Sequence, residues 1–382
     1  MFFLLLLSCG LFPLSLLEAF KSRLLLVALL SSSPELNAKS VWWRSNRNKT
    51  IDSVGVRMLK VLPLVALGVS AFLLLFGNAV VPFTVLREEC LDKVAYNRFG
   101  FKELDIVLCT LVLFFKQALA SDVGKWVSGY TISLYLSVLV FMAVEGSRFR
   151  AGFFLSLTPL YYFLSQAAGV SVVLPAIWLP IYLLYDAGNR HIDLFADKKI
   201  SVIRVAAIGF FLLFVVLNIL GLFFPFQTRE LELAILLFQV SPIAVALFWL
   251  PFATTEGSSQ IHGHKSVLAL HLVYVGIGVV WHLVAILFVI SDPELPMQAF
   301  SLLVSWKTEE FAVYFLLIDG LILFLAFLYL VLLEDGVLAS ILVTVGSLVF
   351  GPASAFSLYF VYREQQISKS FRMAQQESKK RN

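Results

Sequence analysis

Runs of about 20 apolar residues follow one another along most of the chain. A membrane core about 30 Å thick takes about 20 residues as a helix, and the short alternating segments of an outer-membrane barrel are not found. The pattern therefore predicts an all-α, polytopic transmembrane bundle of about nine spans (8–10). The spans are expected over residues 62–86, 104–120, 129–145, 153–185, 202–225, 233–251, 266–290, 311–333 and 337–361.

One apolar run, residues 151–186, is too long for a single upright helix. Its 36 residues would reach roughly 54 Å at about 1.5 Å each. Pro159, Gly169, Pro175 and Pro180 lie within it and can break it. The run is either a kinked long helix or a re-entrant half-helix followed by a span. Because irregular backbone inside a membrane is tolerated where it lines a protein cavity, we expect this run to form a wall of a pocket.

Composition and charge agree with a membrane protein. Hydrophobic residues make up 60% of the 382 residues and charged residues 14%, with a mean hydropathy of +0.89. The net charge of +4 comes from cations clustered at Lys39–Lys60 and Lys369–Arg381. Lipid phosphates explain such juxtamembrane clusters, so we expect a lipid bilayer as partner and no nucleic acid.

Three segments are expected: 1–60, a hydrophobic anchor or signal with a polar stretch; 61–362, the helical bundle; and 363–382, a basic cytosolic tail. Met1–Leu17 is apolar but lacks the leading positive charges of a secretory signal. An uncleaved anchor is favoured over an interfacial helix or a cleaved signal. The pair Lys379-Lys380 resembles a dilysine retrieval signal and suggests the endoplasmic reticulum.

The orientation in the membrane stays open. A cytosolic tail and nine spans place Ser31–Lys60 in the lumen, where Asn48 of the Asn48-Lys49-Thr50 sequon would be glycosylated. The six Lys and Arg residues of Lys39–Lys60 favour the opposite side.

Cysteine and histidine positions predict no metal site. Cys9, Cys90 and Cys109 have no metal-ligand spacing and form no disulfide framework, so we interpret them as ordinary apolar residues. His262 and His264 are expected in a solvated loop. Further along the chain, His271 and His282 are expected as hydrogen-bonded histidines of the bundle.

The segment Asn189–Asp197 resembles the first Asp-rich motif of intramembrane prenyltransferases, in which carboxylates hold magnesium. Asp193 and Asp197 are four residues apart and would share one helix face. However, Arg190 stands where that family has an acid or amide, and no second Asp-rich cluster follows. A polar loop is the favoured interpretation, and a magnesium-dependent prenyltransferase is kept as an alternative.

Two acidic residues are the candidate catalytic groups. Asp319 lies inside the apolar run 311–333, and Glu145 ends the apolar run 129–144. An ionised side chain in a membrane costs at least about 2.5 to 3.5 kcal/mol, so such residues usually face a cavity and have a function. Asp319 is too short to reach the interface. Glu145 has an alternative role, because Arg148, three residues on, can form an ion pair with it.

Short motifs around Glu145 occur in an order that is known from one family. Glu145-Gly146-Ser147-Arg148 is followed by a Phe-Leu-Ser-x-Thr-Pro run from Phe154, and then by Gln166, Gly169 and Pro175. With these motifs the chain resembles the fungal integral-membrane terpene cyclases of the ascofuranone and ascochlorin (meroterpenoid) type. The resemblance covers roughly residues 130–366 and includes the helix of Asp319, although Ile318 replaces the tyrosine of the relatives.

The resemblance implies a cyclase that uses no cofactor and no metal. Its substrate would be a hydrophobic, farnesylated aromatic or polyketide molecule, often with a terminal epoxide, that acid closes into rings. A buried carboxyl suits this chemistry because a low dielectric favours its protonated form, and aromatic rings stabilise a carbocation by about 2 kcal/mol. The expected catalytic residues are Asp319 and Glu145, and the expected substrate contacts are Arg148, Tyr161, Gln166, Tyr185, Gln239 and Trp281.

A third class of function is a non-catalytic carrier or subunit. A carrier is expected to have broken helices at matching places of two repeated halves. The sequence shows no convincing internal repeat.

Overall fold

The computed structural model is almost entirely helical in the residues it describes. Its two strands there, β1 (Ile200–Ser201) and β2 (Gln260–Ile261), form one short antiparallel pair with Ser201 opposite Gln260. The prediction of an all-helical fold is therefore confirmed. The described residues are 54–92, 102–148, 151–189, 200–201, 209, 228–253, 260–261, 263–305 and 307–381.

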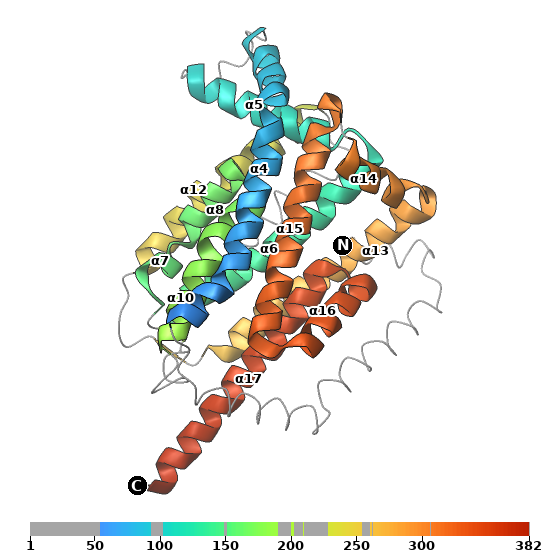
Figure 1. Cartoon of the computed structure of the whole chain (residues 1–382). Coiled ribbons are helices and arrows are strands. Elements are labelled where there is room, and N and C mark those ends of the chain that lie inside the picture. Colours follow the sequence, from blue (N-terminus) through green and yellow to red (C-terminus); the bar gives the residue numbers. More distant parts are fainter. Residues whose placement is uncertain are drawn as a thin grey trace. The chain divides into compact units, whose positions relative to one another are not determined.

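Helices of very different lengths make up this part of the chain (Figure 1). They are α4 (Val54–Asp92), α5 (Lys102–Ala118), α6 (Asp122–Gly146), α7 (Phe153–Ser156), α8 (Thr158–Ala168), α9 (Val170–Val173), the π-helix η2 (Leu174–Trp178), α10 (Leu179–Asn189), α12 (Thr228–Ala253), α13 (His264–Ser291), α14 (Leu295–Val304), the 3₁₀-helix η4 (Thr308–Glu310), α15 (Phe311–Asp335), α16 (Val337–Phe350) and α17 (Pro352–Arg381).

Among the described residues, four helical segments are long and apolar enough to cross a membrane: Met58–Gly77, Asp122–Gly146, His264–Ser291 and Thr308–Asp335. Shorter apolar helices are found at Val170–Leu184, Leu231–Leu247, Leu295–Val304 and Val337–Phe350. The predicted count of about nine spans stays a prediction, because the structure describes only residue 209 of the expected span 202–225.

Two of the predicted spans are broken at a glycine. The run 151–186 breaks at Gly169, between α8 and α9, and the run 337–361 breaks at Gly351, between α16 and α17. The prediction of one unbroken span over 337–361 was wrong. Both glycines have a positive φ, 88° and 87°, which residues with a side chain rarely adopt. Pro352 directly after Gly351 also favours a break there.

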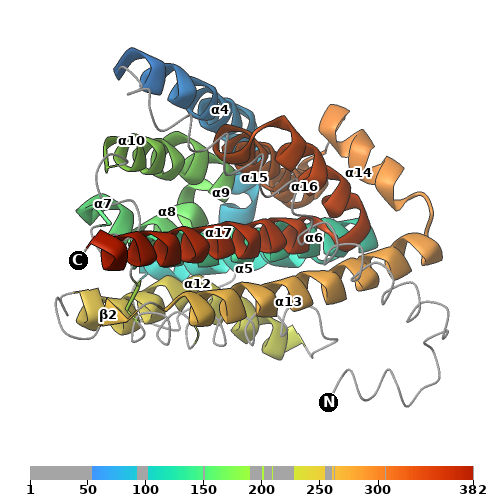
Figure 2. The ribbon, with the colours of Figure 1, turned by 90° about the horizontal axis from the view of Figure 1, so that it is seen from below.

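The bundle has two distinct ends. At one end Gln117, near the end of α5, donates a hydrogen bond to the carbonyl of Thr308, just before α15. At the other end Arg363 of α17 binds Glu145 at the end of α6 and Glu334 at the end of α15. We call this second end the charged end. The view from below shows α17 lying against α6 and α13 (Figure 2), in agreement with the contacts of these helices.

The same order of helices occurs twice in the described chain. The first repeat consists of α4, α5, α6 and the broken pair α8/α9–α10, and the second of α13, α14, α15 and the broken pair α16/α17. Their contacts also correspond. In the first repeat α4 contacts α10 of its own repeat and α15 of the other, and in the second repeat α13 contacts α17 of its own repeat and α6 of the other. The corresponding helices α6 and α15 contact each other. The arrangement of the helices therefore contains a repeat, although the sequence itself shows no convincing one.

The breaks of the two repeats have the same local structure. Gly169 donates its backbone N–H to the carbonyl of Ser165 at 3.0 Å, and Gly351 donates to Ser347 at 3.1 Å. Each broken pair thus has the sequence Ser-x-x-x-Gly before the break. Such a short match cannot be recognised in a sequence that is mostly apolar, which explains why the repeat is visible only in the fold.

A disulfide joins Cys90 of α4 to Cys109 of α5, with 6.0 Å between the Cα atoms. The interpretation of these two cysteines as ordinary apolar residues was wrong. Helices α4 and α5 follow each other in the chain and pack together, which brings the two thiols within reach. Cys9 is outside the described residues.

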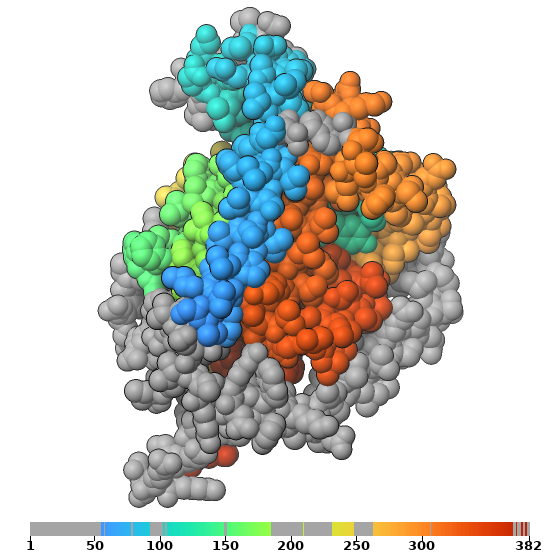
Figure 3. All heavy atoms as spheres, in the orientation of Figure 1, coloured from blue at the N-terminus to red at the C-terminus, as the bar shows by residue number. Residues whose placement is uncertain are grey.

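Large apolar side chains cover the outer surface of the bundle. Figure 3 shows a face formed by α4 and by the helices of the second repeat. Exposed side chains on α4 and α16 include Leu73, Val80, Ile341 and Leu348. An exposed apolar surface of this extent is expected where lipid replaces water as the solvent.

Candidate functional site

An apolar cavity of about 130 Å³ lies beside Asp319 of α15, next to the helix break of the first repeat at Gly169. Six phenylalanines surround it, supplied by α4, α5, α12 and α15, and a few polar side chains interrupt them. Rings on different helices pack edge to face, for example Phe114 on Phe315 with centroids 5.4 Å apart. The lining residues are Phe76, Phe83, Leu111, Phe114, Phe115, Thr131, Ile132, Tyr135, Ser165, Gln166, Ala167, Gly169, Val170, Phe238, Gln239, Phe315, Leu316 and Asp319.

Asp319 is held at the break between α8 and α9. Its Oδ1 accepts a hydrogen bond from the backbone N–H of Ser171 at 3.1 Å and another from the Ser171 hydroxyl. A Cβ on Gly169 would lie 2.9 Å from the same oxygen. The positive φ of Gly169 and its missing side chain therefore both serve to bring the start of α9 against the carboxyl group.

The surroundings of Asp319 are neutral. The side chain is 5% exposed, and no ion pair of Asp319 occurs within the described part of the chain. Buried carboxyl groups without a cationic partner favour the protonated form. The site therefore combines a potential proton donor with electron-rich rings.

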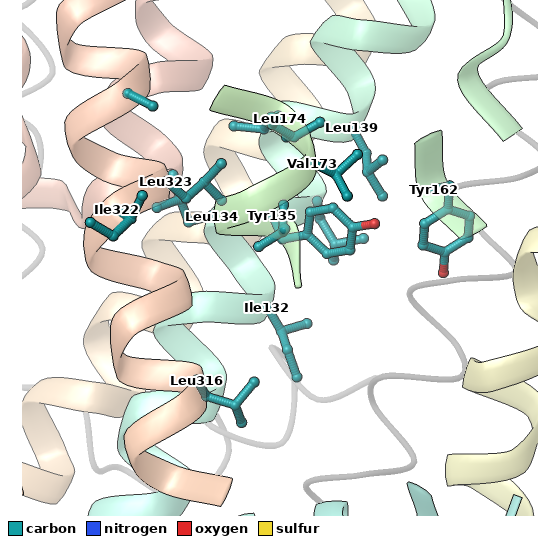
Figure 4. Close-up of a cluster of buried hydrophobic side chains, with 14 of the residues drawn as sticks. Ile132, Leu134, Tyr135, Leu139, Tyr162, Val173, Leu174, Leu316, Ile322 and Leu323 are labelled. Carbon is teal, nitrogen blue, oxygen red and sulfur yellow. The ribbon is translucent and has the colours of Figure 1, made fainter. Parts of the chain in front are cut away.

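Tyr135 brings a hydroxyl group into the same region. Figure 4 shows its ring extending from α6 towards Tyr162 of α8, with the oxygen at its outer end. The two ring centroids are 6.0 Å apart. Tyr162 in turn hydrogen-bonds to Ser241 of α12, so its own hydroxyl is already engaged.

Glu145, the second predicted acid, lies in a different environment. Its Oε1 accepts hydrogen bonds from Arg148 Nε and Arg363 Nη1, both at 2.7 Å. Tyr135, which lines the cavity, is ten residues earlier on the same helix, which is about 15 Å along the axis. Glu145 is not among the lining residues. The ion pair with Arg148, the alternative role predicted for Glu145, is present.

Further charged groups extend this buried network at the charged end. Arg148 also binds Glu364 at 2.6 Å, His264 binds the other Glu364 oxygen at 2.5 Å, and Arg363 binds Glu334 at 3.0 Å. Burial alone would raise the pKa of Glu364, but the charge of Arg148 and the hydrogen bonds from His264 and Arg148 lower it to about 2. The network therefore keeps Glu364 ionised.

The other predicted substrate contacts divide into three groups. Gln166 and Gln239 line the cavity, and Gln166 donates to the carbonyl of Phe238 at 3.1 Å. Tyr161 and Trp281 do not line it: Tyr161 is 3% exposed, and the indole of Trp281 packs on Gly129. The side chain of Tyr185 is outside the described part of the structure.

Asn48, Asp193 and Asp197 also lie outside the described residues. Nothing in the structure bears on the predicted glycosylation or on the magnesium motif. Within the described residues, no cluster of three or more His, Cys, Asp or Glu side chains has the arrangement of a metal site.

Several polar side chains elsewhere in the bundle are buried or have identified partners. His264 is 6% exposed and begins α13, so the expectation of a solvated loop was wrong for this histidine. His282, as expected, is hydrogen-bonded: its Nδ1 lies 2.8 Å from the Tyr130 hydroxyl. Lys116 pairs with Glu232 of α12 at 2.5 Å.

Sequence reasoning missed the phenylalanine cavity and Ser171. Phe315 is four residues before Asp319 and therefore lies on the same helix face, which is a signal that the sequence contains. The contributions of α4, α5 and α12 depend on tertiary packing.

Comparison with protein-family models, with curated proteins and with solved structures finds no match to this chain. Function must therefore be argued from the site itself.

Proposed function

We propose that this protein is a membrane-bound terpene cyclase that acts on a farnesylated aromatic or polyketide substrate in meroterpenoid biosynthesis. The observation that carries the proposal is the position of Asp319, buried without a cationic partner beside a cavity walled by six phenylalanines. A lipophilic substrate dissolves in the bilayer and reaches such a site from the side.

In the proposed reaction the Asp319 carboxyl donates its proton to the oxygen of a terminal epoxide. The carbon–oxygen bond breaks, its electron pair goes to oxygen, and the resulting cation is attacked by the next double bond of the chain. Loss of a proton from the last carbocation to the Asp319 carboxylate restores the acid. The overall step is an isomerisation without a cofactor.

Neighbouring residues have distinct roles in this proposal. Ser171 fixes Oδ1, which leaves the other carboxyl oxygen to carry the proton. The rings of Phe114, Phe238 and Phe315 stabilise the moving positive charge and offer no nucleophile to trap it. Glu145, held between two guanidinium groups, is assigned to stability and not to proton donation.

The test uses microsomes that contain the full-length protein and an epoxy-farnesyl phenol. The wild type should convert it to a cyclic isomer, and Asp319→Asn should bind it but lose at least about 100-fold in turnover, as expected for removal of a general acid. Asp122→Asn, the same change at an exposed acid, should remain fully active. Full activity of Asp319→Asn would exclude Asp319 from the mechanism.

A metal chelator distinguishes the prenyltransferase alternative. Prenyl transfer that depends on Asp193, Asp197 and magnesium should stop when the ion is removed. Cyclisation by Asp319 should continue.

A carrier is the second candidate, and the matching breaks at Gly169 and Gly351 favour it. Paired broken helices in two repeats are typical of transporters, whose sites lie at the breaks. In vesicles containing the purified protein, a carrier would speed the movement of a fluorescent farnesyl phenol between leaflets. A cyclase would leave that rate unchanged.

We further propose that the charged end faces the cytosol of the endoplasmic reticulum. Lys60, whose carbonyl accepts a hydrogen bond from Tyr329, lies near the same end as the basic part of α17, as the positive-inside bias requires. The Cys90–Cys109 disulfide then faces the oxidising lumen. This orientation and the predicted glycosylation of Asn48 exclude each other, and a glycosidase digestion decides between them.

A further inference from the structure

The second repeat has a polar site at its own helix break. His282 of α13 packs against Gly351, where an added Cβ would lie 2.8 Å from the His282 Cβ. The Nδ1 atom of His282 is 2.8 Å from the hydroxyl of Tyr130 on α6. Ionisable groups inside a membrane protein are expensive and usually functional, so this pair needs an explanation that the Asp319 site does not provide.

The repeat relates Tyr130 to Asp319. The corresponding helices α6 and α15 are each 25 residues long, and aligning their first residues pairs Thr131 with Gly320. These two residues also touch, because a Cβ on Gly320 would lie 2.5 Å from the Thr131 hydroxyl. With these two positions equivalent, the preceding residues Tyr130 and Asp319 are also equivalent.

The same correspondence makes Trp126 of α6 the equivalent of Phe315 of α15. Phe315 lines the Asp319 cavity four residues before the acid, and Trp126 lies four residues before Tyr130. The Trp126 ring packs edge to face on Tyr130, with centroids 5.2 Å apart. An aromatic group and a polar group thus accompany the break in both repeats, but the second repeat has a neutral hydroxyl and an imidazole in place of the acid.

The hydrogen bonds of the second site define what it can bind. Tyr130 and His282 share the hydrogen bond at Nδ1, and the Tyr130 oxygen keeps an unused lone pair in either tautomer of the imidazole. The Tyr130 oxygen can then accept a further hydrogen bond. The buried Trp126 Nε1 has no hydrogen-bond partner within the described part of the chain, and it can only donate.

We propose that Trp126, Tyr130 and His282 form a second binding site, related by the repeat to the Asp319 site, for a neutral lipophile with a hydroxyl group. A hydroxyl accepts from Trp126 Nε1 and donates to Tyr130, which satisfies both groups. Tyr130 and Trp126 are half-buried, whereas Asp319 is buried, so the second site is reached from the membrane more easily. The proposal does not depend on the cyclase activity.

The test is photolabelling of the full-length protein in lipid nanodiscs with a diazirine-bearing hexadecanol, and with its methyl ether as the matched probe. Label from the alcohol should map to α6, α13 and the residues around Gly351. Tyr130→Phe and Trp126→Phe, which keep the rings, should each lower it about fivefold, the effect of one lost hydrogen bond. Tyr329→Phe, which removes a hydroxyl bonded elsewhere, should leave it unchanged.

Equal labelling by the alcohol and the ether would overturn the proposal, as would unchanged labelling in both Tyr130→Phe and Trp126→Phe. Label confined to the Asp319 cavity would also contradict it. Thermal unfolding of each variant shows whether the fold is retained, and His282→Gln provides a third variant if one of the others does not fold. Its amide can still accept a hydrogen bond from Tyr130, so labelling should be partly retained.

Discussion

Two buried acids in one bundle have opposite surroundings. Asp319 has a serine and a backbone N–H as partners and an aromatic cavity beside it. Glu145 has two arginines and lies at the end of its helix. In a medium of low dielectric the first environment favours a protonated acid and the second a carboxylate. The difference shows that burial of an acid alone does not indicate catalysis. The groups that contact the acid determine which protonation state its environment favours.

The largest expected effect comes from breaking the charged network. Arg363→Met leaves Glu334 and part of the Glu145 charge uncompensated inside the protein, which should lower the free energy of unfolding by about 3 to 5 kcal/mol. Arg372→Met on the same helix, where the side chain is exposed, should change it by less than about 0.5 kcal/mol. Unfolding by a titration with dodecyl sulfate measures both. Equal stability of the two variants would contradict the structural role of the network.

The disulfide should stabilise the side of the bundle that contains the cavity. Helices α4 and α5, which it joins, both supply cavity phenylalanines. The two cysteines are 19 residues apart, and closing such a loop is worth about 3 kcal/mol. Replacing both Cys90 and Cys109 by serine should lower the stability by this amount and make it insensitive to reductant. Cys9→Ser is the control, and an unchanged stability in the double variant would argue against the crosslink.

Acid should weaken the network around Glu364. Because the pKa of Glu364 in the folded protein, about 2, is below its ordinary value of 4.5, its contribution is complete above about pH 4.5 and is lost as the pH falls towards 2. It amounts to at most about 3.5 kcal/mol, at about 1.4 kcal/mol for each pH unit. Unfolding measured between pH 6 and 3 should show this loss. In Glu364→Gln the curve should be flatter, and an identical slope would refute the assignment.

The smallest effect concerns how Asp319 is held. Ser171→Ala removes one of two hydrogen bonds to Oδ1 and keeps the backbone N–H, so turnover of the epoxy-farnesyl phenol should fall about fivefold. The KM should stay unchanged, because Ser171 orients the acid and does not contact substrate. Ser156→Ala, where the hydroxyl donates to the carbonyl of Phe153, is the control. A change in KM alone would indicate that Ser171 binds the substrate.

The sequence was sufficient for the helical class, for the broken run 151–186 as a pocket wall, and for Asp319 as a buried acid. Each of these depends on local properties: apolar runs, a glycine among prolines, and a charge in an apolar helix. The Cys90–Cys109 disulfide, the partners of Glu145 on α17 and the repeat could not be predicted. They join residues up to 218 positions apart, and nothing in the local pattern specifies which helices meet.

The central claim is that Asp319 carries a proton while Glu145 does not. Infrared spectroscopy of the purified protein at neutral pH tests it, because a protonated carboxyl has a C=O band that a carboxylate lacks. We predict one such band, absent in Asp319→Asn and unchanged in Glu145→Gln. A band that persists in Asp319→Asn, or that disappears only in Glu145→Gln, would contradict this account.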